Sequence, residues 1–160
     1  MRFAFVAAAA LSLIASAAHA ADFRYPETGK PLIGFSVPDD WTTHVDAAKK
    51  ITSISGDKAI TFTAKLMDYD ADPEALAVST ATAAKAGELY NPQDIVLSSF
   101  EGFSYYSRLE TNPDTIFRIV IVQLDNSHVV LCTMTTSAKL DVDRAWAAEN
   151  VLRTLRFSRP

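Results

Sequence analysis

The sequence predicts an α+β fold in which helices flank an antiparallel β-sheet. After residue 31 most apolar residues occur in short alternating runs, the pattern of half-buried strands. Tight turns join successive runs, and strands joined in this way pair antiparallel. Only two segments have helical capping and spacing, so the strands cluster instead of alternating with helices.

The first twenty residues predict a cleaved signal peptide. Arg2 supplies a positive charge, and residues 3–18 are almost wholly apolar. Ala18 and Ala20 are the two small residues that a signal peptidase requires. The apolar run is shorter than the roughly 20 residues of a membrane span, and no cysteine follows it as a lipid anchor. We therefore expect a periplasmic or secreted protein, cleaved near Ala20, with no membrane span afterwards.

Composition predicts one modestly acidic globular domain. Hydrophobic residues make up 49% and charged residues 21% of the chain, which argues against disorder. We expect a lead-in at 21–31 and a single domain at 32–160. The formal charge is −4 and no stripe of Lys or Arg occurs, so we expect no nucleic-acid partner. The lone Cys132 cannot form an intramolecular disulfide, and its apolar neighbours predict burial.

The first half of the domain predicts three strands and a helix. A strand over 32–37 ends at Pro38, which lacks an amide donor. Short strands at 51–55 and 59–66 flank a turn at Gly56-Asp57. Asp72 and Pro73 fit the N-cap and first position of a small-residue helix that ends at Gly87.

The second half predicts four strands and a closing helix. Strands are expected over 95–100, 103–110, 115–124 and 129–136, with a break at Gly102 and a hairpin turn at Asp125-Asn126-Ser127. The third is apolar on both faces and should be covered on both. A helix over 141–155 has a stripe of apolar residues: Ala145, Ala148, Leu152 and Leu155.

This order of elements resembles the Mog1/PsbP-like proteins, which include exported bacterial proteins of the DcrB type. The resemblance rests on Phe35-Ser36-Val37-Pro38-Asp39-Asp40-Trp41, on Phe100-Glu101-Gly102-Phe103 and on the closing Leu152, Leu155 and Phe157. It implies an antiparallel sheet between helices, an α/β/α sandwich, and a non-catalytic accessory or binding role. It carries no catalytic residue onto this chain.

An acidic loop is the one candidate metal site. Asp68 and Asp70 alternate with other carboxylates, a pattern that can gather around Ca²⁺. An EF-hand loop that starts at Asp68 would need Gly at Pro73 and Glu at Ser79, and Asp72 is already explained as a helix cap. A calcium-stabilised domain is therefore an alternative and not the favoured interpretation.

The sequence holds no recognisable catalytic motif. Once the signal is removed only His44 and His128 remain, both in or beside turns. No nucleophile elbow, nucleotide-binding glycine motif or CxxC occurs, so we expect no enzyme and no cofactor. A small hydrolase-like enzyme with an unrecognised site, near Asp68, Asp70 or His44, stays open as an alternative.

Two aromatic residues are the candidate contacts for a ligand or partner. Trp146 lies off the apolar stripe of the closing helix among polar neighbours, so it either anchors a partner or is covered by another segment. Tyr105 and Tyr106 must point to opposite faces of their strand. The sequence thus favours an exported, non-enzymatic module that binds an envelope protein or a small ligand through Trp146 or Tyr106.

Overall fold

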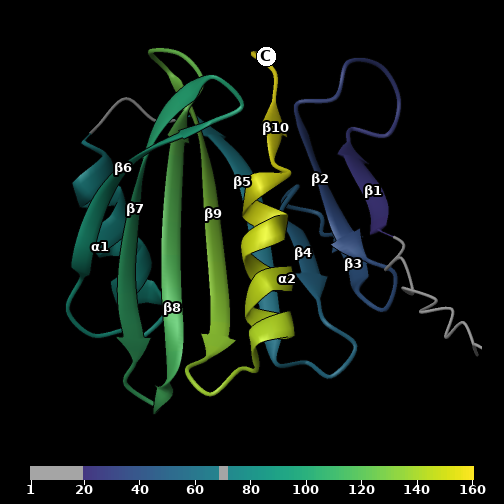
Figure 1. The fold of residues 1–160 in the computed structure, drawn as a ribbon. Helices are drawn as coiled ribbons and strands as arrows, with labels where there is room; N and C mark the ends of the chain where they lie inside the picture. The colour runs from purple at the N-terminus through teal and green to yellow at the C-terminus, as the bar shows by residue number, and fades with distance from the viewer. Residues whose placement is uncertain (1–19, 69–71) are drawn as a thin grey trace, which may run out of the picture.

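The computed structural model describes residues 20–68 and 72–160, and in them every strand pair is antiparallel. A seven-stranded sheet has the order β3-β4-β5-β9-β8-β7-β6, and a three-stranded sheet has the order β1-β2-β10 (Figure 1). The long sheet comprises β3 (Thr42–Val45), β4 (Ile51–Ile54), β5 (Ile60–Asp68), β6 (Tyr90–Leu97), β7 (Phe100–Leu109), β8 (Asn112–Gln123) and β9 (His128–Ser137). The short sheet comprises β1 (Ala20–Tyr25), β2 (Ile33–Pro38) and β10 (Arg156–Phe157).

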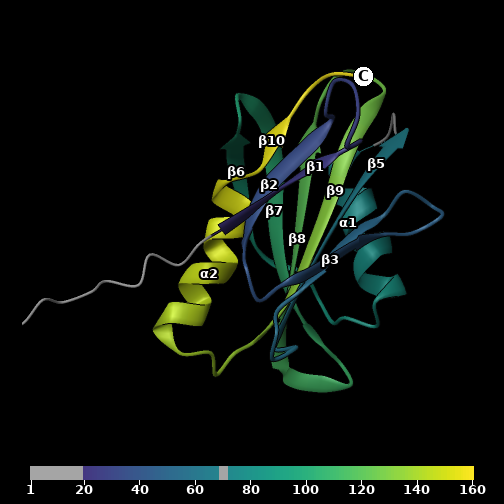
Figure 2. The ribbon, with the colours of Figure 1, turned by 90° about the vertical axis from the view of Figure 1, so that its right-hand side faces the viewer.

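Two helices cover opposite faces of the long sheet in this part of the chain. Helix α1 (Pro73–Ala83) packs on β7 and β8 from one side, and α2 (Val142–Arg153) lies on the other side, where it contacts β2 (Figures 1 and 2). The predicted α+β architecture, an antiparallel sheet between helices, is confirmed. None of the described helices is long and apolar enough to cross a bilayer.

The core has two parts because the sheet is apolar on both faces. Strand β8 sends Phe117, Ile119 and Ile121 toward α1, and it sends Val120 and Val122 toward α2 and the short sheet. The prediction that this strand is covered on both sides is confirmed. Cys132 is buried in the α2-side core, where burial alone raises the pKa of its thiol to about 12.

Both helices begin where the sequence predicts. The carboxylate of Asp72 accepts a hydrogen bond from the backbone N–H of Glu74, and that of Asp141 accepts one from Arg144. The first helix ends earlier than predicted. Lys85, at φ 54°, makes the left-handed turn that was expected of Gly87.

Two other expectations are wrong in detail. Half of the expected lead-in at 21–31 is strand β1, which pairs with β2 from Ala20 to Tyr25. Gly102 is no break, because the turn of the β6–β7 hairpin falls at Ser98-Ser99, both in the left-handed region. Gly102 lies inside β7, where a Cβ would come within 2.5 Å of the carbonyl oxygen of Ile121. Glycine is required there by close approach of the next strand.

Candidate functional site: an aromatic cleft beside α2

Tyr106 lies in a row of side chains that crosses three strands on the α2 side of the sheet. Strand pairing places Tyr90 of β6 and Arg118 of β8 directly on either side of it. The Tyr90 and Tyr106 rings stack, with centroids 6.1 Å apart and planes at 29°. The guanidinium of Arg118 lies on the ring of Tyr106, with Cζ 5.0 Å from the ring centroid.

Arg118 ties this row to α2. Its Nη1 donates to Oε1 of Glu149 at 2.7 Å, and its Nε donates to Oγ of the fully buried Ser104 at 3.0 Å. Burial raises the pKa of Tyr106, while the charge of Arg118 lowers it and that of Glu149 raises it. Tyr106 is therefore neutral at ordinary pH and its hydroxyl can donate a hydrogen bond.

A cleft of about 260 Å³ opens between this row and α2. Its sheet side is lined by Tyr106, Ile116, Arg118, Met134 and Thr136, its far end by the 137–140 segment, and its helix side by Ala145, Ala148 and Glu149. The two alanines leave space between helix and sheet because their side chains end at Cβ. An apolar wall with a charged pair at its rim suits an apolar side chain whose neighbour is polar.

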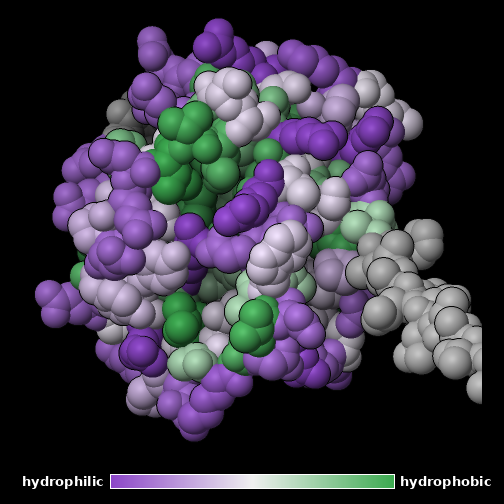
Figure 3. Space-filling view, in the orientation of Figure 1, coloured by the Kyte–Doolittle hydropathy of each residue, from purple (hydrophilic) through white to green (hydrophobic). Residues whose placement is uncertain are grey.

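Trp146 stands on the solvent side of α2. It is 63% exposed and Val142, one turn earlier, is 81% exposed. The alternative that another segment covers Trp146 is wrong for the described residues. Helical spacing puts Asp143 one turn before Trp146 and Glu149 one turn after it. Figure 3 shows this face of the molecule, with hydrophobic surface gathered above and to the left of α2 and single hydrophobic side chains along its lower end.

The structure groups a histidine with the candidate metal residue. Asp68, at the exposed end of β5, has Oδ1 3.5 Å from Nε2 of His128. Nδ1 of His128 lies 2.8 and 2.9 Å from the two carboxylate oxygens of Asp125. Backbone donation from Ser127, followed by His128, lowers the pKa of Asp125. Sequence reasoning missed this pairing, although three-residue spacing across a hairpin turn was a signal for it.

Neither alternative function gains a site from these contacts. Asp70 lies outside the described residues, and within them no three His, Cys, Asp or Glu side chains are close enough to hold a metal ion. Both ring nitrogens of His128 face carboxylates, and no hydroxyl or thiol of the described chain is bonded to them. His44 is exposed on the edge strand β3, far in sequence and sheet order from His128.

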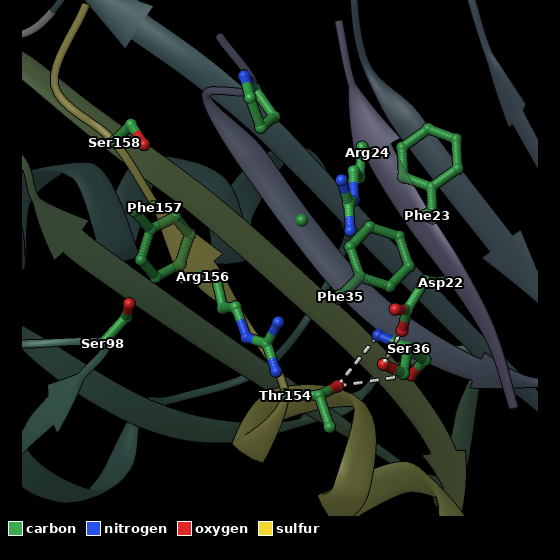
Figure 4. A pocket seen from close by; sticks show the side chains of 12 residues that line it. Asp22, Phe23, Arg24, Phe35, Ser36, Ser98, Thr154, Arg156, Phe157 and Ser158 are labelled. Atoms are coloured by element: carbon green, nitrogen blue, oxygen red, sulfur yellow. Dashed lines mark hydrogen bonds between the residues drawn. The ribbon is translucent and has the colours of Figure 1, made fainter. Parts of the chain in front are cut away.

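A second hollow, of about 350 Å³, lies on the short sheet and was not expected from the sequence. Figure 4 shows Arg24 and Asp22 of β1 on one side of it and Arg156 on the other, with Thr154 and Ser36 at one end. The hydroxyl of Thr154 accepts a hydrogen bond from the backbone N–H of Ser36 at 3.0 Å, which holds the end of α2 against β2.

Comparison with known proteins defines the class of fold. No protein-family model and no curated protein sequence matches the chain. Among solved structures, cyanobacterial PsbP (CyanoP) from Synechocystis sp. PCC 6803 matches with a TM-score of 0.62 and 8% identity over 96% of this chain and 98% of that one. LpqN, involved in cell envelope biogenesis of Mycobacterium tuberculosis, matches with a TM-score of 0.59 and 15% identity over 88% and 92%. The protein has the PsbP-like fold, and the resemblance seen in its sequence is confirmed at that level.

Proposed function

We propose that the protein is an exported, non-enzymatic accessory module of the cell envelope that holds a protein partner on the cleft beside α2. One observation carries the proposal: Trp146, a large aromatic side chain, is exposed on the helix that walls an apolar cleft containing Tyr106. Tryptophan and tyrosine are among the residues that most often dominate protein interfaces, and here an exposed tryptophan lies beside a pocket lined by a half-buried tyrosine.

The surroundings of Trp146 indicate the chemistry of the partner. Asp143 lies one helical turn before the indole and forms no ion pair among the described residues, whereas Glu149, one turn after it, is already paired with Arg118. A lysine or arginine of the partner can stack on Trp146 beside the carboxylate of Asp143. An adjacent apolar side chain can then enter the cleft over Met134 and Ile116. The partner is therefore a protein segment that pairs a cationic residue with an apolar one.

The similarity to LpqN supports an envelope role, since that protein is involved in cell envelope biogenesis and shares this fold. The signal pattern at residues 1–20 supports export. Export is tested by mass spectrometry of the protein purified from the periplasm or medium of its host. A mature chain that begins at Ala21 is expected, and an intact Met1 in the cytoplasm would contradict it.

Site-specific photo-crosslinking in the producing cell tests the interface. A crosslinking amino acid at Val142, beside an intact Trp146, should capture one reproducible protein, whereas the same group at exposed Val78 on α1 should not. The captured protein is then purified and titrated against the module. Trp146→Ala should weaken its binding at least about tenfold, as at an interface hot spot. Val78→Ala should leave the affinity unchanged. Equal capture from both faces, or binding indifferent to Trp146→Ala, would reject the proposal.

A further inference from the structure

We propose that the outer face of the short sheet binds a phosphate group between Arg24 and Arg156. This second site is separate from the cleft beside α2: the two share no lining residue. It lies over the hollow shown in Figure 4, where the side chains of both arginines stand on the same side of the short sheet.

Strand register brings the two arginines to one position of the sheet. Arg24 of β1 and Arg156 of β10 are both the direct partners of Gly34 on the central strand β2. Ile33, Phe35 and Val37 alternate into the core, so Gly34 and its two partners face outward. Strands lie about 4.8 Å apart, which puts the two arginine backbones about 10 Å from each other. Guanidinium groups on such long side chains can close on one anion from two sides.

Gly34 keeps the centre of this row empty. Its φ is not in the left-handed region, and a Cβ would lie 3.4 Å from the carbonyl oxygen of Phe23, an ordinary contact. The backbone therefore does not require glycine at this position. Any larger side chain would stand between the two arginines and fill the floor of the hollow.

Neither guanidinium is used by the fold. In residues 20–68 and 72–160, the side chains of Arg24 and Arg156 form no ion pair or hydrogen bond, whereas those of Arg118 and Arg144 both pair with carboxylates. The hollow contains one carboxylate, that of Asp22, which accepts a hydrogen bond from Oγ of Ser36 at 2.6 Å. Two positive charges against one leave the site positive in a chain of net charge −4.

Phosphate is the anion that fits this arrangement. Its several oxygens can accept the parallel N–H pairs of two guanidinium forks at once, a geometry that arginine provides and lysine does not. The hydroxyls of Ser98 and Ser158 also line the hollow and can donate to further oxygens. A volume of about 350 Å³ leaves space for the rest of a small phosphate ester or for a lipid headgroup.

The test is an NMR titration of the mature protein with inorganic phosphate, in which sodium chloride keeps the ionic strength constant. Saturable shifts of the amide signals of Gly34, Ser36 and Arg156 are expected. Arg24→Gln and Arg156→Gln should each weaken binding about tenfold, because each removes charge-assisted hydrogen bonds. Gly34→Val should weaken phosphate binding by a similar factor, because the valine side chain would fill the space between the two arginines. Arg153→Gln, which removes an equal charge from exposed α2 outside the hollow, is the matched control and should change nothing.

Vesicles distinguish the two sources of phosphate. The protein should sediment with phosphatidylcholine vesicles that contain phosphatidylglycerol, but not with vesicles of pure phosphatidylcholine, if the site binds a lipid headgroup. Arg24→Gln should then abolish this sedimentation. Saturable binding of inorganic phosphate without sedimentation identifies a soluble ligand. Shifts that do not saturate would overturn the proposal. So would shifts that persist unchanged in both arginine variants when the spectra of these variants show that they are folded.

Discussion

Arg118 and Tyr106 face each other across neighbouring strands, with the guanidinium carbon 5.0 Å from the ring centroid. The same guanidinium is bonded to Ser104 below it and to Glu149 of α2 beside it. One side chain therefore joins the floor of the cleft to its helical wall. Helix α2 is also held near its start by the ion pair of Arg144 with Asp57, and beyond its end by the hydrogen bond between Thr154 and Ser36. The Arg118–Glu149 link lies between these two contacts, beside the cleft.

Replacement of Arg118 should cost more stability than loss of its ion pair alone. Arg118→Met leaves the buried Ser104 hydroxyl without the partner that the structure gives it, so we expect the free energy of unfolding to fall by about 1–3 kcal/mol. Glu149 has a half-exposed side chain, and Glu149→Gln should cost about 1 kcal/mol or less. Urea denaturation measures both. Equal losses for the two variants would show that the Ser104 contact contributes nothing.

Truncation of the two tryptophans should have very different effects on the free energy of unfolding. Trp41 is 9% exposed and packs in the α2-side core, so Trp41→Ala should lower the free energy of unfolding by about 3–5 kcal/mol. Trp146→Ala should change it by about 0.5 kcal/mol or less, as expected for a surface position. Iodide should quench the fluorescence of Trp146, measured in a Trp41→Phe variant, far more than that of Trp41, measured in Trp146→Phe. A large stability loss from Trp146→Ala would mean that the indole serves the fold and not a partner.

The elements that sequence reasoning found are those with local signals. Asp72 and Asp141 cap helices by accepting hydrogen bonds from backbone N–H groups two or three residues later in the chain. Neighbouring residues of β8, such as Ile119 and Val120, alternate between the two faces of the sheet, and this alternation is also a local pattern. Strand β1 has a local signal too, with Phe23 inward and Arg24 outward. The polar residues on its outer face and the turn that follows favoured the interpretation of this segment as an irregular lead-in.

What was missed depends on contacts between distant segments. Gly102 indicates a break in the sequence, but close approach of the Ile121 carbonyl is the reason for glycine there, and that follows from how β7 pairs with β8. Tyr106 could be proposed as a contact residue, yet its position on Arg118 depends on the same register. The row of Arg24, Gly34 and Arg156 joins residues more than 100 positions apart, which no local pattern predicts.

The β8–β9 turn should make part of the protein's stability dependent on acid pH. The carboxylate of Asp125 accepts hydrogen bonds from the backbone N–H groups of Ser127 and His128, and these and the His128 ring hold its pKa below 3.8. A carboxyl whose pKa is lower in the folded than in the unfolded chain contributes stability above its unfolded pKa. That stability is lost as the pH falls through the folded pKa. We therefore expect the free energy of unfolding to decline below pH 3.8, and to decline less steeply in Asp125→Asn. Asp39→Asn, at an exposed residue that bonds to no other described group, should leave the slope unchanged.

NMR titration of the side-chain carboxyl carbons separates the two causes of this low pKa. Because backbone donation from Ser127 is the larger cause and the His128 ring the next, His128→Gln should raise the pKa of Asp125 but leave it below 3.8. A pKa of Asp125 that reaches 3.8 in His128→Gln would assign the whole effect to the imidazole. A pKa of Asp125 unchanged from that of the wild type would show that the 2.8 Å contact with Nδ1 of His128 does not contribute to the low pKa.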